Sequence, residues 1–277
     1  QPSVSSAELW PLGNKVANLR TDIQVLLESQ VERDNAAGMN TRALLVVHNG
    51  SILGEAYAQG ANRTTPLLGW SMAKSLTSVM LGNLELRGLL NLDSSPQFDE
   101  WLNDDRSNIK ITDLLTMSDG LEFSEKYNPG DDATTMLFTS PSASDFTIAR
   151  PFAHEPGARF NYSSGTANIL SRIYLDVLGG PQQSYDDYKA NIAEPLGFQN
   201  AVFEMDASGA FFGSSYLYAS ARDWARLGQL MVDGGAINGR EIVTQDWIDR
   251  ATAPNSTDNQ KAYGYQWWLN RGNEELR

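Results

Sequence analysis

Ser71 and Lys74 are the two residues whose types and spacing could do chemistry. They stand three apart, at the start of a run with helical periodicity, so their side chains share one face of a helix. A serine hydroxyl is a weak nucleophile and needs a base. Burial and the positive end of a helix dipole both lower the pKa of a lysine, which suits Lys74 to that role. The same helix start could aim a backbone N–H at an oxyanion.

The pattern also has an ordinary structural explanation, because serine is a favoured N-cap and lysine is common on helices. Two features favour the chemical interpretation. A second motif follows at a suitable distance, and the inner face of the expected helix is almost wholly apolar. That helix is expected to end near Gly88, and its apolar face consists of Met72, Leu76, Val79, Met80 and Leu84.

The second motif centres on Tyr162, in a polar loop directly before the apolar helical run Ala167–Leu178. A tyrosine placed there can point its hydroxyl into a cleft. Near a cationic lysine its pKa is expected to fall, which would make it a proton shuttle between Ser71 and a leaving group. The alternative is a tyrosine that packs its ring while its hydroxyl caps the loop.

Composition excludes several classes of function. The chain has 277 residues, 41% of them apolar, which is enough for a sizeable core. A net charge of −13 argues against binding to nucleic acid or anionic lipid, and we attribute the acidity to solubility. The absence of cysteine excludes thiolate catalysis and disulfides, and two histidines, His48 and His154, are too few for a typical catalytic zinc site. We expect no metal and no cofactor.

No stretch of the sequence reaches the roughly 20 apolar residues that span a bilayer. The sequence starts at Gln1 without a methionine. This start fits the removal of an export signal, and it fits equally well a boundary chosen for the protein. The expectation is therefore an exported protein, in a bacterial periplasm or outside the cell.

The elements expected around these motifs indicate an α+β fold. An amphipathic helix over Val16–Arg33 precedes a hairpin, Ala43–His48 and Ile52–Tyr57, that turns at Asn-Gly. Ser220 has capping-box spacing to Asp223 and opens a helix through Val232. We expect a short helical segment over Thr112–Met117, a long loop over Glu122–Arg150 with at most one helical turn, and a strand over Tyr263–Leu269.

This order predicts an antiparallel sheet flanked by helices, together with a mostly helical lobe. The expected ranges are 1–70 for the first helix and hairpin, 71–235 for the lobe that carries both motifs, and 236–277 for the return to the sheet.

Taken together, the residues resemble the serine β-lactamase and penicillin-binding-protein superfamily. The likeness rests on Ser71-Met-Ala-Lys74, on the Pro156-Gly-x-x-Phe-x-Tyr162-Ser lead-in, on Ile111–Leu121 and on Ser220–Gly228, and it covers nearly the whole chain. The chain is most similar to the class C-like branch and, within it, to hydrolases of 6-aminohexanoate (nylon) oligomers and related esterases. The resemblance implies that Ser71, Lys74 and Tyr162 form the catalytic set.

Two departures from the family pattern bear on substrate and architecture. Ser164 stands where many β-lactamases have an asparagine that contacts the substrate amide, which argues against efficient β-lactam hydrolysis. Ser164 is then a candidate substrate contact. The family's third motif, K-T-G or H-x-G on a late strand, does not occur before Arg277. The resemblance therefore leads us to expect further C-terminal strands, in a missing segment or in a second polypeptide that completes the sheet.

Four further residues are candidates for the site. Tyr127 lies in the long loop, where a tyrosine of the nylon-oligomer hydrolases closes over the substrate amide, and packing within the loop is the alternative. Asp131 and Asp132 could attract a substrate amine, although a solvated loop explains them better. His154 does not fit a Ser-His-Asp arrangement, because no catalytic histidine follows late in the chain.

The sequence therefore leads us to expect a serine hydrolase that forms an acyl-enzyme on small esters or linear amides. Two alternatives stay open. One is a non-catalytic or singly acylated relative that serves as a binding or scaffold protein. The other is a β-lactamase or D,D-peptidase.

Overall fold

The computed structural model describes residues 8–255, 257 and 262–269. Contacts divide these residues into two compact units. The hairpin unit comprises the described residues of 1–68, 189–202 and 218–241, and the helical unit those of 69–188, 203–217 and 242–277. The predicted ranges 1–70, 71–235 and 236–277 do not coincide with these units, because 189–202 and 218–241 return to the unit that holds the hairpin. Helices and small antiparallel sheets confirm the predicted α+β class.

Strands β1 (Ala43–His48) and β2 (Ser51–Tyr57) form the predicted antiparallel hairpin. Asn49 and Gly50 at its turn have φ values of 47° and 67°. Positive φ at both central residues is what a two-residue turn of matching twist requires, so Asn-Gly was a sound signal.

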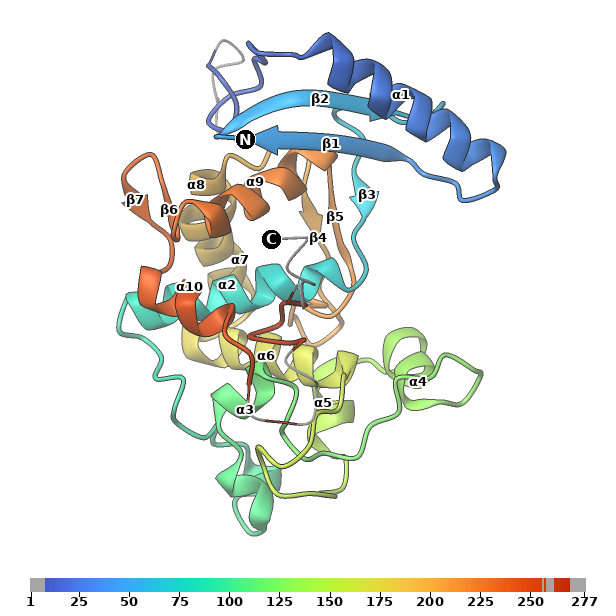
Figure 1. Cartoon of the computed structure of the whole chain (residues 1–277). Helices are drawn as coiled ribbons and strands as arrows, with labels where there is room; N and C mark the ends of the chain where they lie inside the picture. Colours follow the sequence, from blue (N-terminus) through green and yellow to red (C-terminus); the bar gives the residue numbers. More distant parts are fainter. Residues whose placement is uncertain (1–7, 256, 258–261, 270–277) are drawn as a thin grey trace. The chain divides into compact units, whose positions relative to one another are not determined.

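Helix α1 (Thr21–Ala36) covers one face of this hairpin (Figure 1). Leu27 and Val31 of the helix pack on Ala56 of β2. The helix begins later than the predicted Val16, because the segment before it is extended: the Arg20 N–H donates to the Leu53 carbonyl at 2.8 Å.

The opposite face of the hairpin meets α9 (Ala221–Val232), where Arg222 forms a buried ion pair with Glu55 of β2. Ser220 caps α9 as predicted, accepting from the Asp223 N–H at 3.2 Å. The hairpin unit also contains a π-helical segment (Lys189–Ala193), helix α8 (Glu194–Leu196), strand β3 (Leu67–Leu68), and the paired strands β6 (Ala236–Ile237) and β7 (Arg240–Glu241). Strand β3 pairs with Tyr218 and Ala219 of β5 (Leu217–Ala219), whose first residue falls in the helical unit.

Helix α6 (Ser164–Leu178) is the centre of the helical unit. It packs against α2 (Met72–Leu86), α3 (Ile111–Leu115), α5 (Ala143–Ile148) and α7 (Pro181–Tyr188). The apolar face predicted for α2 is buried apart from Met72. The remaining elements are α10 (Gln245–Ala251), the 3-10 turns Asp99–Trp101 and Asp105–Asn108, and β4 (Val202–Phe203), whose two residues fall in different units.

The predicted loop over Glu122–Arg150 is the first correction, since it holds two helices, α4 (Asp132–Phe138) and α5. Their apolar residues form a cluster with Phe123. The serine that looked like a loop residue is a cap: Ser142 Oγ accepts from the Asp145 N–H at 3.2 Å. The polar residues at the starts of these two short helices had been interpreted as part of a loop.

The predicted strand over Tyr263–Leu269 is the second correction. An isolated bridge joins Tyr263 to Trp268 across a tight turn. Gln266 has a φ of 60°, and its side-chain Nε2 donates to the carbonyls of Leu114 and Leu115 at 3.1 Å and 3.0 Å. Its backbone N–H also donates to Leu115, at 3.0 Å. The aromatic residues of this segment pack around the turn instead of alternating along a strand.

Candidate active site

Ser71 lies at the N-cap of α2, with its side chain exposed. The chain reaches it through Trp70, whose φ of 45° is uncommon for a bulky residue. Such strain is often stored at functional sites. Within the described part of the chain, the structure gives the backbone N–H of Ser71 no acceptor.

Lys74 lies one turn behind Ser71 and is 1% exposed. Its Nζ donates to Ser71 Oγ at 3.3 Å, to Ser164 Oγ at 3.1 Å and to the Ser214 carbonyl at 3.0 Å. Burial lowers the pKa of Lys74 to about 8, against the attraction of Glu125, which raises it. An ammonium with this pKa loses its proton near neutral pH, which is what a base for Ser71 requires.

Tyr162 lies beside this pair. Its hydroxyl lies close enough to Ser71 for that hydroxyl to act on its pKa, and Lys74 Nζ lies 5.0 Å from the centre of its ring. The ring packs on Trp268 at 5.3 Å and on Tyr263 at 6.0 Å. Burial raises the pKa of Tyr162, although the hydrogen bond with Ser71 lowers it. The expected fall of this pKa is therefore wrong, and Tyr162 is a neutral phenol that can both donate and accept.

Ser164 is the first residue of α6 and is fully buried. Its Oγ accepts from Lys74 and donates to Glu125 Oε1 at 2.5 Å, while its backbone N–H donates to Glu125 Oε2 at 2.7 Å. The structure therefore brings Ser164 to the cluster as an internal link between Lys74 and Glu125. A direct contact of its side chain with substrate stays a prediction.

Tyr127 also reaches the cluster. Its side chain is 50% exposed, and its hydroxyl donates to Glu125 Oε1 at 2.8 Å. Partial burial raises the pKa of Tyr127 to about 12, as does the hydrogen bond to Glu125. The loop thus holds an exposed aromatic ring at the site and anchors it through the carboxylate of Glu125.

Two participants were not predicted from the sequence, and a third, Trp268, fitted either the core or a cleft wall, with the core favoured. Glu125 stands two residues before Tyr127 and is the acidic residue nearest to that tyrosine in the sequence. Ser214 acts through its backbone carbonyl. Asn168 of α6 fixes this residue: the Ser214 N–H donates to Asn168 Oδ1 at 3.2 Å, and Asn168 Nδ2 donates to Ser214 Oγ at 3.1 Å. Trp268 contributes an indole against Tyr162. A carbonyl and a long-range ring contact leave no local pattern.

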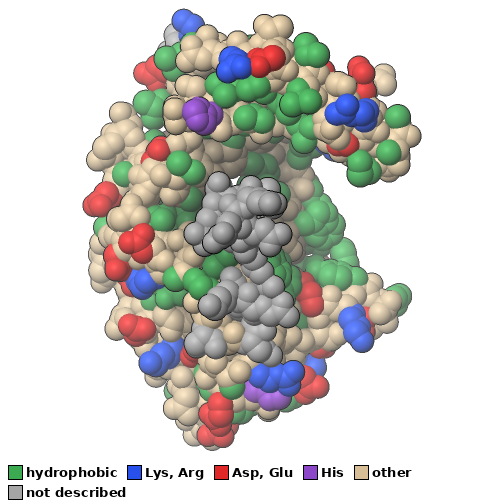
Figure 2. All heavy atoms as spheres, viewed as in Figure 1, with side chains coloured by type: hydrophobic (Ala, Val, Ile, Leu, Met, Phe, Trp, Pro, Cys, Tyr) green, Lys and Arg blue, Asp and Glu red, His purple; other side chains and the backbone are tan. Residues whose placement is uncertain are grey.

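Large apolar side chains are exposed on both sides of Ser71 in the chain and against the ring of Tyr162. Trp70 is 47% exposed, Met72 49% and Trp268 61%. Exposed apolar groups beside a nucleophile offer binding surface to an uncharged substrate. Acidic side chains, by contrast, are scattered over the face shown in Figure 2 and do not gather at one place.

The other residues weighed from the sequence have structural partners. Asp131 accepts from the Asn128 backbone at 2.9 Å, and Asp132 accepts from the Ser124 N–H at 2.9 Å, so both order the turn before α4. His154 is exposed, with Nε2 3.2 Å from Arg159. Among the described residues no group of side chains could hold a metal ion, and no helix has the length and apolarity to cross a bilayer.

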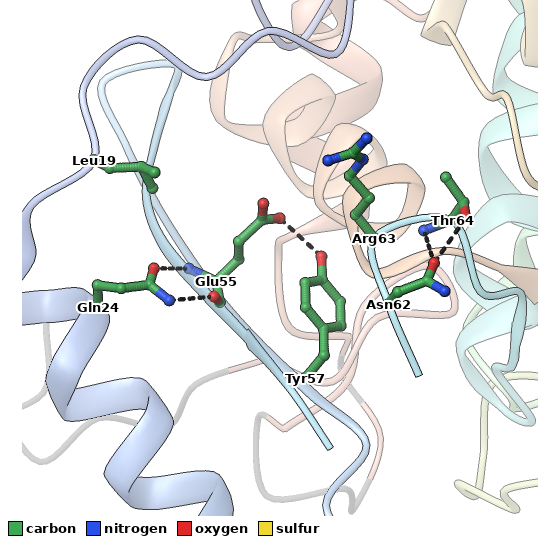
Figure 3. A pocket seen from close by; sticks show the side chains of 7 residues that line it. All are labelled: Leu19, Gln24, Glu55, Tyr57, Asn62, Arg63 and Thr64. Atoms are coloured by element: carbon green, nitrogen blue, oxygen red, sulfur yellow. Dashed lines mark hydrogen bonds between the residues drawn. The ribbon is translucent and has the colours of Figure 1, made fainter. Parts of the chain in front are cut away.

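A cavity of about 560 Å³ lies within the hairpin unit and shares no residue with the Ser71 cluster (Figure 3). Its polar groups already bind one another. The Tyr57 hydroxyl donates to the Glu55 carboxylate at 2.8 Å. The Gln24 side chain donates to the Glu55 carbonyl at 2.8 Å and accepts from the Glu55 N–H at 3.1 Å. The Glu55 carboxylate is further held by Arg222. The cavity therefore offers no convergent free groups for chemistry.

Comparison with known proteins agrees with this geometry. The Beta-lactamase family model matches residues 26–275. The chain is 24% identical over 261 residues to the 6-aminohexanoate-dimer hydrolase of Paenarthrobacter ureafaciens, and the match covers 84% of this chain and 65% of that protein. The chain thus spans less than two thirds of the length of this curated relative.

Solved structures share the fold. A candidate 6-aminohexanoate-dimer hydrolase from Bacillus anthracis matches with a TM-score of 0.72 and 21% identity, over 89% of this chain and 68% of that one. A penicillin-binding protein from Bacillus halodurans matches with a TM-score of 0.64 and 17% identity, over 83% of this chain and 81% of that one.

Proposed function

The chain belongs to the beta-lactamase family, and we propose that it is a serine hydrolase that forms an acyl-enzyme on small esters or linear amides. One observation carries the proposal: the buried amine of Lys74 lies 3.3 Å from the exposed hydroxyl of Ser71. The other groups of the cluster can accept and donate the protons that the reaction transfers.

Acylation begins with neutral Lys74. Its Nζ takes the proton of Ser71 as Oγ attacks the carbonyl carbon of the substrate. The new bond between Oγ and that carbon forms the tetrahedral intermediate, and the carbonyl oxygen becomes an oxyanion. The N–H of Ser71 supplies one donor for that oxyanion. The hydroxyl of Tyr162, which lies next to Ser71, passes a proton to the leaving alcohol or amine and regains one from Lys74. The carbon–leaving-group bond breaks, and the acyl group stays on Ser71.

Deacylation runs through the same groups in reverse. A water molecule takes the place of the departed alcohol or amine. Tyr162 and neutral Lys74 accept its proton as its oxygen attacks the acyl carbonyl. Collapse of the second intermediate returns a proton to Ser71 Oγ and releases the acid. The starting protonation state of Lys74 is thereby restored.

The surroundings of Ser71 favour an uncharged, partly apolar substrate. Trp70, Met72 and Trp268 expose apolar surface, and the carboxylate of Glu125 is already engaged by Ser164. The similarity to a 6-aminohexanoate-dimer hydrolase supports linear amides as one substrate class.

The rival is a relative that is acylated once and does not turn over. p-Nitrophenyl butyrate distinguishes the two, because release of p-nitrophenol reports each acylation. The proposed enzyme releases many equivalents per Ser71 at a steady rate, and the Ser71→Ala variant releases none above the uncatalysed rate. A burst of one equivalent followed by no further release would establish the rival instead.

A further inference from the structure

Glu125 makes the densest set of contacts of any acidic residue at the site. One oxygen of its carboxylate accepts from the Ser164 N–H at 2.7 Å. The other accepts from Ser164 Oγ at 2.5 Å and from the Tyr127 hydroxyl at 2.8 Å. Bonds to a carboxylate are stronger than those between neutral groups, and these come from two separate segments.

The contacts form a chain that ends at the nucleophile. Ser164 Oγ has one hydrogen to donate, and it donates it to Glu125, so its lone pairs face Lys74. Lys74 Nζ is thus held by Ser164, by the Ser214 carbonyl and by Ser71 itself. When Lys74 is neutral it has two hydrogens for the two outer acceptors, and its lone pair is then free to face Ser71.

Without Glu125, the hydroxyl of Ser164 is free to turn and to donate to Lys74. The hydroxyls of Ser164 and Ser71 would then compete as hydrogen-bond donors to the lone pair of neutral Lys74. The carboxylate removes this competition, because it fixes the direction of one hydroxyl. This is a positioning effect, exerted on Lys74 through Ser164.

We propose that Glu125 is a positioning residue that orients Lys74 through Ser164 and anchors the hydroxyl of Tyr127. The inference rests on the proposed function, since it assigns Lys74 the role of base. It also gives Glu125 a second effect, which is electrostatic. The groups that face Lys74 are Ser71, Ser164, the Ser214 carbonyl and the ring of Tyr162, with Tyr263 behind that ring.

Among the residues that the structure describes, Glu125 is the carboxylate whose charge supports the charged form of Lys74, and it opposes the effect of burial. Its removal therefore lowers the pKa of Lys74 further. Activity that depends on neutral Lys74 rises as the pH passes that pKa. The acid limb of kcat/KM should consequently move to lower pH when the carboxylate is lost, while the plateau falls because the orientation is lost.

The test compares pH profiles of p-nitrophenyl ester hydrolysis for the wild-type protein and for Glu125→Gln, Glu125→Asp and Glu122→Gln. Glu122 is an exposed acid on the same loop and serves as the matched control. We expect Glu125→Gln to lower the plateau of kcat/KM by roughly tenfold to a hundredfold and to move the acid limb down by roughly one pH unit. Glu125→Asp, which keeps the charge, restores the wild-type position of the limb.

An acid limb that stays in place in a folded Glu125→Gln protein would overturn the inference, as would a wild-type plateau. A similar shift in Glu122→Gln would also overturn it, since the effect would then be general surface charge. Failure of the proposed function looks different: the wild-type protein itself would then show neither turnover nor labelling of Ser71 by a fluorophosphonate.

Discussion

The amine of Lys74 lies 3.1 Å from the hydroxyl of Ser164, although 90 residues separate them in the chain. The first turn of α2 and the first turn of α6 therefore meet, and each places a polar side chain in a buried position. Ser71 stands exposed at the edge of this contact. The arrangement makes Lys74 a group whose charge state is set by burial and whose direction is set by neighbouring hydroxyls.

The pH dependence of hydrolysis should report the pKa of Lys74. Neutral Lys74 is the active form, so kcat/KM for a p-nitrophenyl ester is expected to rise with pH, to reach half its maximum near pH 8, and to level off above that. Lys74→Ala is expected to lower the plateau by about 10²–10⁴-fold. An acid limb centred near the ordinary pKa of a carboxyl group, together with an active Lys74→Ala protein, would rule out this base.

The Tyr162→Phe variant separates chemistry from packing. The ring of Tyr162 packs on Trp268 and Tyr263, and phenylalanine keeps those contacts. We expect kcat to fall by about 10²-fold or more, because the proton path to the leaving group is lost, with little change in the free energy of unfolding. Urea denaturation and steady-state kinetics on the same sample measure both. Unchanged kcat would reduce Tyr162 to a packing residue.

Much of the fold followed from local patterns. The Asn-Gly turn, the capping serine Ser220 and the apolar face of α2 each occur within a few residues, and each was found where expected. The two failures have a common cause. Helices α4 and α5 are short and have Asp131 and Ser142 as their N-caps, and the segment Tyr263–Leu269 is rich in aromatic residues but closes a turn. Short elements take their structure from tertiary contacts, which local propensity does not contain.

Substrate preference follows from the state of Ser164. Its hydroxyl is engaged by Lys74 and Glu125, and it stands where many β-lactamases have an asparagine. We therefore expect a higher kcat/KM for short-chain p-nitrophenyl esters than for nitrocefin. The two rates are compared on one preparation, with Ser164→Asn as the matched variant. Faster hydrolysis of nitrocefin by the wild-type protein would contradict this expectation.

A buried acid near the site should couple stability to pH. Asp119 is 3% exposed and accepts from Thr166 Oγ1 at 2.6 Å, and burial raises its pKa to about 6. Because the folded pKa exceeds the unfolded value near 4, the folded state binds this proton more tightly. The resulting stability is fully present below about pH 4 and is lost as the pH rises to about 6, by about 3 kcal/mol.

Asp119→Asn tests this coupling, because an amide does not titrate. The free energy of unfolding of the variant, relative to the wild-type protein, should rise by about 3 kcal/mol between pH 4 and pH 7. Urea denaturation at both pH values measures the difference. A difference between the two proteins that is the same at both pH values would show that Asp119 titrates normally.

The candidate site was only partly accessible to prediction. Ser71 and Lys74 are one helical turn apart, so their proximity follows from α2 alone, and Tyr162 was placed by its loop before a buried helix. Glu125 and the Ser214 carbonyl join the cluster through tertiary structure. The direction of the Tyr162 pKa was also missed, since the amount of ring burial depends on Trp268 and Tyr263.

Covalent labelling of Ser71 tests the central claim most directly. The wild-type protein is incubated with a fluorophosphonate, and the adduct is located by intact mass and by peptide mapping, with Ser71→Ala and Ser75→Ala in parallel. Ser75 is the neighbouring serine of α2, and its hydroxyl donates to the Gln266 carbonyl at 2.9 Å, outside the Lys74 cluster. We predict one adduct, on Ser71, that Ser71→Ala abolishes and Ser75→Ala retains. Undiminished labelling of a folded Ser71→Ala protein would contradict the account.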